Sequence, residues 1–307
     1  MSRTADGGTA SHPLVVTPAR LRSWPLPRAH GDKNSAGRVL VVGGNEGMPG
    51  AVLLAAESAM RAGAGKLQVA TLASVAPALG VAIPEGYVAG LPAGEGGDLS
   101  VAAADRIVAM AERCDAVVLG PGFMHPDAAA SLLRAVVPRL DTSVCLDALA
   151  LAVLTEHLEG VRHLAGRCVL STNPVELFAT LGETPPDDLE TDDGRAALVD
   201  AVVRLSAATD AVVVCGAGVS FVARPDGAVW TDEAGGQGLA VSGSGDVKAG
   251  IIVGLLARGA SPEQAAVWAD HVHGRCGERL ASEFGPRGFM ARDLPARVPQ
   301  VLSELEA

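Results

Sequence analysis

The sequence predicts a three-layer α/β/α sandwich built on a mostly parallel central sheet, and three observations lead to that prediction. Short apolar runs such as 38–42, 115–119 and 211–215 lack polar alternation, which is typical of strands buried on both faces. Longer segments with helical patterns separate these runs. Several runs end in glycine-rich turns, which are typical of the carboxyl edge of a parallel sheet, where ligands of such folds bind.

The first residues differ in character from the rest. Residues 1 to about 30 are polar, contain prolines and lack a hydrophobic pattern, so we expect a flexible N-terminal segment. We expect its first dozen residues to be disordered and the remainder to run along the domain surface. Residues 31–307 are predicted to form a single domain, because no linker or internal repeat divides them.

The elements of this domain follow from the pattern in order. A strand at 37–42 ends in Gly43-Gly44, and a helix from about 51 to 62 follows, with Pro49 in its first turn and Gly63 as its stop. Further strands are predicted at 66–71, 115–119, 144–148, 167–171, 211–215, 219–223 and 228–231, the last two joined by an Asp226-Gly227 turn. Further helices are predicted at 102–114, from 174 to about 181, at 195–208, after Asp246, at 261–283 and at 294–305, with loops at 94–97 and 183–194.

The composition of the chain excludes some classes of binding partner. The chain has 307 residues, of which 49% are hydrophobic, and a formal net charge of −11, which argues against nucleic acid or an anionic membrane as a partner. Neither a membrane-spanning run nor a signal peptide is expected. The five cysteines are scattered singly, so we expect a reduced, cytoplasmic protein without a Cys/His metal site.

The stretch 238–258, GLAVSGSGDVKAGIIVGLLAR, holds the main candidate site. A glycine loop that runs into a helix leaves backbone N–H groups unpaired, and these groups together with the helix dipole form a site for phosphate. Asp246 would repel that phosphate unless it takes up a proton beside it. The alternative is that Asp246 only caps the helix and the glycines only make a turn. We favour a base that works beside a nucleotide.

The GSGD string before an apolar helix resembles the ribokinase-like superfamily. Together with the GG…MPGA…RAGAG block and GPG at 120–122, it resembles the ADP/ATP-dependent NAD(P)H-hydrate dehydratases, which repair damaged nicotinamide cofactors. The resemblance covers about residues 30–300. It implies a ribokinase-like fold, a nucleotide-like substrate, ADP or ATP as cosubstrate with Mg²⁺, and a homo-oligomer. No motif in the chain identifies the ligands of the metal.

The resemblance also implies roles for individual residues. Asp246 is the catalytic residue of GSGD, and the substrate-binding residues are expected to be Ala51, Gly122, Asp147, Asn173, Glu176 and Asp246. The nucleotide-binding residues are expected to be Cys215, Gly216, Ala217, Gly218 and Val219, together with Gly243, Ser244 and Gly245. Lys33 is given a possible role near phosphate.

Three positions make the chain a divergent member of that family. Asn173-Pro174-Val175-Glu176 stands where the family has His-Pro-x-Glu, and residues 215–219 read Cys-Gly-Ala-Gly-Val where it has Lys-Gly-Ala-x-Thr. Val241-Ser242 replaces Thr-Gly ahead of GSGD. Either the nucleotide binds more weakly, or the pocket accepts a different ligand.

Three functions remain open from the sequence. The first is a dehydratase that phosphorylates a substrate hydroxyl and then eliminates phosphate. The second is a ribokinase-like small-molecule kinase, which would release a stable phosphoester. The third is a non-catalytic nucleotide-binding homologue, which would bind nucleotide irrespective of Asp246.

Overall fold

The structure is a computed structural model that describes residues 6–27 and 35–307. The role predicted for Lys33 lies outside the described residues. Within these ranges, no helix has both the length and the apolar composition needed to cross a membrane.

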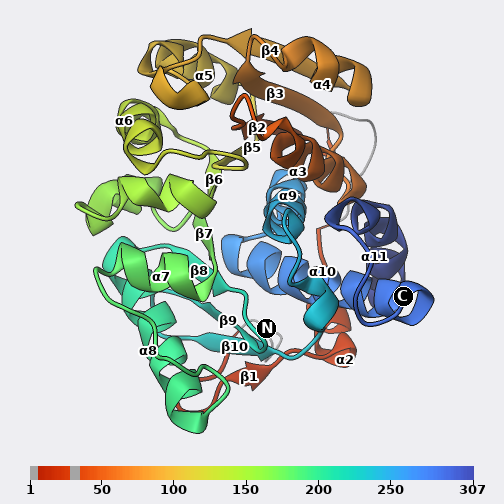
Figure 1. The fold of residues 1–307 in the computed structure, drawn as a ribbon. Coiled ribbons are helices and arrows are strands. Elements are labelled where there is room, and N and C mark those ends of the chain that lie inside the picture. The colour runs from red at the N-terminus through yellow and green to blue at the C-terminus, as the bar shows by residue number, and fades with distance from the viewer. Residues whose placement is uncertain (1–5, 28–34) are drawn as a thin grey trace.

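A ten-stranded sheet forms the middle layer of the described part of the chain (Figure 1). In space the strands follow the order β1-β10-β9-β8-β7-β6-β5-β2-β3-β4, and only β9 runs antiparallel to its neighbours. The mostly parallel sheet predicted from the sequence is confirmed. The strands are β1 (Leu14–Val15), β2 (Arg38–Val42), β3 (Lys66–Leu72), β4 (Gly86–Leu91), β5 (Ala116–Leu119), β6 (Ser143–Asp147), β7 (Cys168–Thr172), β8 (Val212–Cys215), β9 (Ser220–Ala223) and β10 (Val229–Asp232).

Helices cover both faces of this sheet (Figure 1). One face carries α2 (Pro18–Arg22), α3 (Pro49–Arg61), α4 (Ala76–Ala82), α9 (Ser244–Ala257), α10 (Pro262–Phe284) and α11 (Val298–Glu306). The other carries α5 (Ala104–Ala111), α6 (Pro126–Val136), α7 (Pro174–Thr180) and α8 (Asp192–Thr209). Short 3₁₀ helices lie in the connections, at Glu95–Gly97, Val101–Ala103, Val137–Arg139, Ala148–Val153, Leu158–Leu164, Gln237–Leu239, Ala291–Asp293 and Pro295–Arg297.

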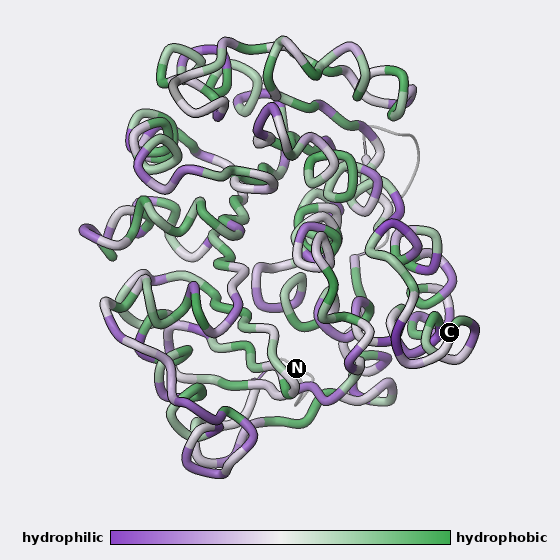
Figure 2. Tube along the Cα trace, viewed as in Figure 1, coloured by the Kyte–Doolittle hydropathy of each residue, from purple (hydrophilic) through white to green (hydrophobic). Residues whose placement is uncertain are grey.

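The central strands supply two separate apolar cores because their side chains alternate between the two faces. In β2, Val39 and Val41 belong to the core under α9 and α10, whereas Leu40 and Val42 belong to the core under α5 and α6. The trace in Figure 2 is accordingly green along the central strands and the inner helices. Strands buried on both sides explain why the sequence shows continuous apolar runs.

The strand order reverses between β2 and β5, so the loops that follow these two strands meet. The N–H of Gly44 donates to the carbonyl of Pro121 at 2.8 Å. A Cβ at Gly43 would lie 2.1 Å from the same carbonyl oxygen, which only glycine permits. The glycine pair and the GPG turn are therefore two halves of one switch-point crevice.

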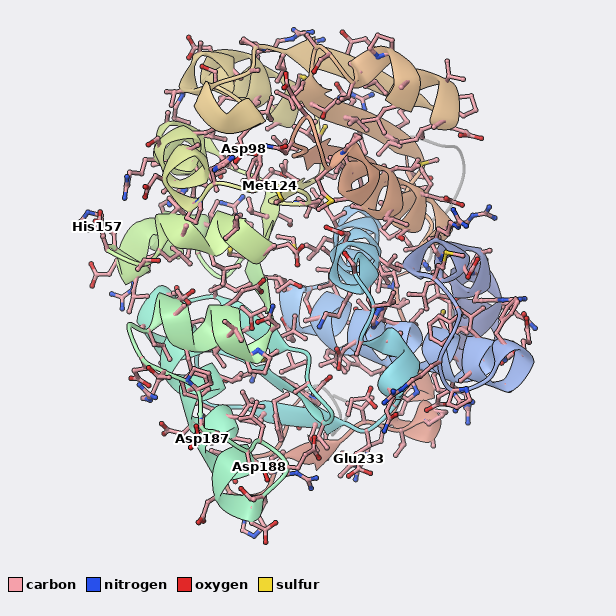
Figure 3. The ribbon with its side chains drawn as sticks, in the orientation of Figure 1. Asp98, Met124, His157, Asp187, Asp188 and Glu233 are labelled. Carbon is pink, nitrogen blue, oxygen red and sulfur yellow. The ribbon has the colours of Figure 1, made fainter. Side chains whose placement is uncertain are left out.

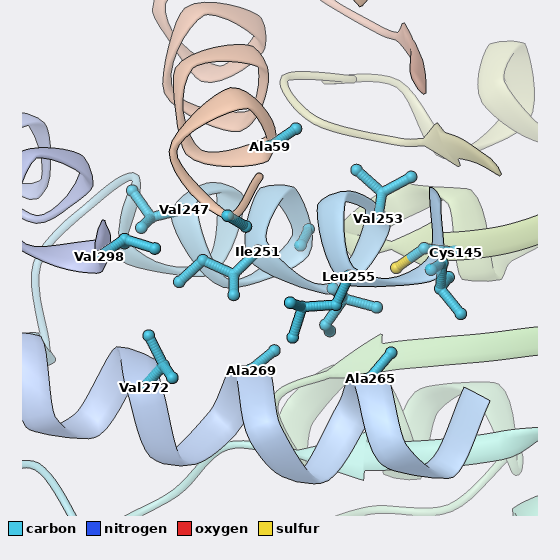
Figure 4. Packing of buried hydrophobic residues seen from close by; sticks show 14 of the residues in the cluster. Ala59, Cys145, Val247, Ile251, Val253, Leu255, Ala265, Ala269, Val272 and Val298 are labelled. Atoms are coloured by element: carbon cyan, nitrogen blue, oxygen red, sulfur yellow. The ribbon is translucent and has the colours of Figure 1, made fainter. Parts of the chain in front are cut away.

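Helix α9 is the most enclosed helix of the fold. It lies between α3 and α10, with Ile251 and Leu255 turned toward α10 (Figure 4). On the opposite side a Cβ at Gly250 would lie 2.3 Å from the carbonyl oxygen of Ala55, and one at Gly254 would lie 2.6 Å from that of Ala59. The close packing predicted from these two glycines is confirmed.

The N-terminal segment differs from the sequence expectation at residues 6–12, which were expected to be disordered, whereas the residues that follow them lie along the domain surface as expected. Residues 6–27 lie against the domain: β1 pairs with β10, and Trp24 stacks on Trp230 with ring centroids 6.1 Å apart. The Trp24 carbonyl accepts from the Trp268 indole at 3.1 Å. A two-residue strand and a single tryptophan leave no periodic pattern, so the sequence did not reveal these contacts.

Three further elements were missed between residues 72 and 136. Helix α4 and strand β4 fall in the segment that we left unassigned, because each is short and contains glycine. Helix α6 had a usable signal, since Pro126 opens an alanine- and leucine-rich run.

We predict opposite effects for two glycine-to-alanine changes in helices. Gly80→Ala in α4 has open space around it and should raise the free energy of unfolding by about 0.5–1 kcal/mol through helix propensity. Gly250→Ala gains the same propensity but forces α3 away, and should lower the free energy of unfolding by about 1–3 kcal/mol. Chemical denaturation of both variants tests this. A Gly250→Ala variant as stable as the wild type would show that the helices are not in tight contact.

Candidate active site

A cavity of about 980 Å³ opens at the carboxyl ends of β6, β7 and β8, below the first turn of α9. Its wall combines strand-end residues, the loop 216–218, the segment 234–243 and one side of α10. The cavity brings together most of the predicted site, namely Asp147, Asn173, Glu176, Gly216, Ala217, Gly218, Gly243, Ser244, Gly245 and Asp246.

The first turn of α9 presents free backbone donors to this cavity. Gly243 precedes the helix with φ of 90°, in the left-handed region that favours glycine. The N–H of Ser244 already donates to the Val241 carbonyl at 3.1 Å. In the described chain the N–H groups of Gly245 and Asp246 have no backbone acceptor, as expected for the start of a helix. These two groups are the donors that the predicted anion site requires.

Asp246 lies in this first turn with an altered proton affinity. Burial, and then the charge of Glu176, raise the pKa of Asp246 from 3.8 to about 6. An acid with this pKa is ionised at neutral pH yet basic enough to accept a proton in a reaction. The geometry thus supports the base that the sequence suggested more than a simple cap.

Two more carboxyl groups share the cavity. Burial, and then the charge of Asp246, raise the pKa of Asp147 well above its usual range, while the Ser171 hydroxyl opposes this shift. Burial also raises the pKa of Glu176, against hydrogen bonds from Asn173. Burial and the neighbouring negative charge therefore make the Asp147 carboxyl group hold its proton more tightly than an exposed aspartate does.

Asn173 has a structural task at the start of α7. Its side-chain oxygen accepts from the N–H of Glu176 at 3.0 Å, and the Glu176 carboxylate accepts from the N–H of Asn173 at 3.0 Å. This reciprocal pair is a capping box, for which the spacing Asn-x-x-Glu was a readable signal. Asn173 still borders the cavity, so a contact with substrate remains a prediction.

The predicted nucleotide loop is only partly directed at the cavity. Gly216, Ala217 and Gly218 line it. Cys215 is fully buried in the core under α8, and burial raises the pKa of its thiol to about 12. Val219 packs against the same core. The expectation that the Cys215 side chain faces the nucleotide is wrong, because residues of β8 alternate between the two faces of the sheet and Cys215 falls on the core side. Val219 precedes β9 and does not line the cavity either.

Three cavity residues were missed in the sequence. Lys248 of α9 and Asp270 of α10 are buried and approach to 3.5 Å between Nζ and Oδ1. His273 lies 2.9 Å from the Ser244 hydroxyl through Nε2. Burial and the charge of Lys248 lower the pKa of His273 to about 3, so the ring is neutral. A lysine inside an otherwise apolar helix was the signal that could have found this group.

His271 and His273, two positions apart on α10, contact different partners. His271 Nδ1 lies 2.8 Å from the Asp232 carboxylate, away from the cavity residues. Among the described residues, no group of three or more His, Cys, Asp or Glu side chains is arranged to hold a metal ion.

Ala51 and Gly122 lie together outside this cavity. A Cβ at Gly122 would lie 3.0 Å from the Cβ of Ala51, and one at Gly243 would lie 2.6 Å from Leu54 Cδ1. Neither Ala51 nor Gly122 lines the cavity, but Ala51 is on the same helix, α3, as Leu54, which approaches the Gly243 turn at the cavity wall. The predicted substrate residues thus fall into two groups that meet at this turn.

Asp98, also missed in the sequence, connects the loops around Gly122. This buried carboxylate accepts from the N–H groups of Met124 and His125 and from the Asn45 amide at 2.8 Å (Figure 3). It thereby ties the loops that follow β2, β4 and β5. Met48 and Met124 flank this junction and are 40% and 47% exposed, which leaves an apolar rim beside Gly122.

Comparison with known proteins gives a consistent result. The family model described as NAD(P)H-hydrate dehydratase matches residues 39–300. The ADP-dependent (S)-NAD(P)H-hydrate dehydratase of Xanthomonas campestris pv. campestris is 42% identical, over 95% of this chain and 96% of that relative. Several other relatives are bifunctional NAD(P)H-hydrate repair enzymes, and the chain spans about half of their length.

Solved structures agree with the fold. The ADP/ATP-dependent NAD(P)H-hydrate dehydratase from Bacillus subtilis, co-crystallised with ATP/Mg²⁺, superposes with a TM-score of 0.75 at 26% identity, covering 95% of this chain and 99% of that one. A ribokinase-like superfamily protein from Enterococcus faecalis gives 0.77 at 19% identity, covering 96% and 97%. The ribokinase-like fold is thereby confirmed.

The pKa of Asp246 predicts how pH affects stability. The pKa of Asp246 is about 6 in the folded protein, above the ordinary 3.8, so the folded state binds the proton of this carboxyl group more tightly than the unfolded state does. The protonated group therefore stabilises the fold at low pH, and this stabilisation is lost as the pH rises from about 4 to about 6. An asparagine side chain cannot ionise. At about pH 7.5, Asp246→Asn should therefore raise the free energy of unfolding by about 2 kcal/mol, with the difference vanishing near pH 4. Thermal unfolding across this range measures it. A variant that is less stable than the wild type at every pH would mean that the carboxylate is a stabilising cap.

Proposed function

This chain belongs to the NAD(P)H-hydrate dehydratase family, and from that premise we propose that it dehydrates hydrated NADH or NADPH at the expense of a nucleotide, ADP or ATP. The observation that carries the proposal is the position of Asp246. Its carboxylate has a pKa of about 6 and lies in the turn with the free N–H groups, which lines the same cavity as the glycine loop 216–218. A proton acceptor and a phosphate site are thus held side by side.

In the proposed reaction, Asp246 accepts the proton of the substrate hydroxyl. The oxygen forms a bond to the terminal phosphorus of the nucleotide, and the bond from that phosphorus to the bridging oxygen breaks, releasing the shortened nucleotide. The phosphorylated carbon then loses inorganic phosphate as its C–O bond breaks, and the neighbouring carbon loses a proton to form the double bond. The N–H groups of Gly245 and Asp246 stabilise charge on the transferring group.

The remaining site residues fit supporting roles. The Asp147 carboxyl group lines the cavity and can form a hydrogen bond with the substrate, and Gly216, Ala217 and Gly218 offer backbone groups to the nucleotide. The nicotinamide part of the substrate would lie near Ala51 and Gly122, where the exposed Met48 and Met124 offer an apolar surface.

Magnesium, a cytoplasmic location and assembly into a homo-oligomer are part of the same proposal. Magnesium would come with the nucleotide and be held mainly by its phosphates, supplying charge neutralisation. Light scattering of the purified chain measures the number of copies.

The decisive experiment supplies (S)-NADH hydrate with ADP or ATP and follows the return of the dihydronicotinamide absorbance together with inorganic phosphate. We expect kcat/KM of about 10⁴ M⁻¹s⁻¹ or more with at least one nucleotide, in the ordinary range for an enzyme. A stable phosphoester in the product would instead support the kinase alternative. Nucleotide binding without any turnover would support the non-catalytic one.

Asp246→Asn should lower kcat by about 10²–10⁴-fold, because a general base is lost. In the wild type, kcat/KM should rise with pH up to about 6 and then level off, since the ionised form of Asp246 is the active one. Asp105→Asn, on the exposed surface of α5, is the matched control and should leave both quantities unchanged. More than a tenth of wild-type activity in Asp246→Asn would remove Asp246 from the base role.

A further inference from the structure

The cavity has an uneven charge. Among the described residues that line it are four carboxyl groups, those of Asp147, Glu176, Asp246 and Asp270, whereas Lys248 is its one lysine or arginine. A diphosphate or triphosphate brings further negative charge. The loop 215–219 carries no cationic side chain, and backbone N–H groups supply only partial charge. If a nucleotide binds here, the described part of this cavity has one full positive charge available to meet it.

Lys248 reaches the nucleotide loop from a different element. It lies on α9, two residues after Asp246, and its Nζ would be 2.5 Å from a Cβ placed on Gly216. The ammonium therefore occupies the space beside Gly216 where any larger residue would have its side chain. One face of Lys248 is turned to the cavity, between the loop 216–218 and the first turn of α9.

Among the described residues, Lys248 has one ion pair, and that pair leaves donors of its ammonium for other partners. Its side chain is only 8% exposed, so it has lost most of its water, and such burial is costly without good partners. The distance of 3.5 Å to Asp270 exceeds the roughly 2.7–2.9 Å of a strong charge-assisted hydrogen bond. An ammonium has three donors, so it can keep Asp270 while donating to a ligand in the cavity.

We propose that Lys248 is the phosphate-binding cation of this chain, contacting the terminal phosphates of the bound nucleotide from helix α9, with Asp270 holding the ammonium in place beside Gly216. This inference rests on the proposed nucleotide-dependent function. It assigns the charge at the phosphate site to a residue outside the nucleotide loop, and it makes Asp270 a positioning residue.

The test measures nucleotide affinity by calorimetry on the full chain, with adenosine, AMP and ADP as probes. Lys248→Met should weaken ADP binding about 10- to 100-fold, the loss of a charge-assisted hydrogen bond, but leave adenosine binding unchanged because adenosine has no phosphate. The effect on AMP should fall between the two. The graded effect separates a phosphate contact from general damage to the cavity.

A double variant removes the risk that an unpaired Asp270 unfolds the protein. Lys248→Met with Asp270→Asn leaves no buried charge at this position, and it should melt near the wild-type temperature while still binding ADP about 10- to 100-fold more weakly. Asp270→Asn alone retains the cation and should bind ADP within about threefold of the wild type, or more tightly.

The competing explanation is a purely structural ion pair. In that case the double variant would bind ADP as tightly as the wild type, which would overturn the assignment of Lys248. An equal loss of affinity for adenosine and ADP would overturn it as well. If the wild type itself bound neither ADP nor ATP, the proposed function would fail together with this inference, whereas normal turnover with an unaffected double variant would remove the lysine role alone.

Discussion

The close approach of α9 to α3 is the constraint on which the site depends. Gly250 and Gly254 allow the backbone of α3 to reach α9, and this contact fixes the axis of α9 above the sheet. The turn at Gly243 is held by the same pair of helices, since Leu54 of α3 packs directly against it. The direction of the free N–H groups and the position of Asp246 therefore follow from small residues several turns away. A site built on a rigid helix start keeps its geometry better than one built on a loop alone.

The second organising feature is the concentration of acids in one buried cavity. Burial raises the pKa of Asp147, Glu176 and Asp246, and the charge of neighbouring acids raises the pKa of Asp147 and Asp246 further. This arrangement costs stability at neutral pH, since an ionised carboxylate is held away from water. It also creates the base that a proton transfer at neutral pH requires. The site therefore lowers the stability of the fold locally, and the burial of the two large apolar cores on either side of the sheet offsets this loss.

The structure also shows where the residues that differ from the family pattern lie. Cys215 at the start of the nucleotide loop is a core residue, and its thiol is not a substitute for a cation. The charge lies instead on Lys248, a neighbour in space and 33 positions away in sequence. Asn173 is a helix cap paired with Glu176, so its oxygen is engaged by α7 whatever the ligand. The positive charge that the loop 215–219 lacks is therefore present in the same region of space, on a residue from another part of the sequence.

The sequence by itself determined the layer architecture, most of the strands, the helix after GSGD and the candidate base. Each of these has a local cause, since continuous apolar runs, glycine turns and capping residues act over a few positions. The sequence could not predict the contacts that hold residues 6–27 on the domain, such as Trp24 against Trp230, nor that the carboxylate of Asp98 joins three loops. Only the tertiary structure could decide which side chains share the cavity, because Lys248, Asp270 and His273 come from helices that meet only when the sheet is complete. The pKa shifts of the cavity residues could not be predicted from the sequence either, because burial and neighbouring charge are properties of the folded chain and not of the local sequence.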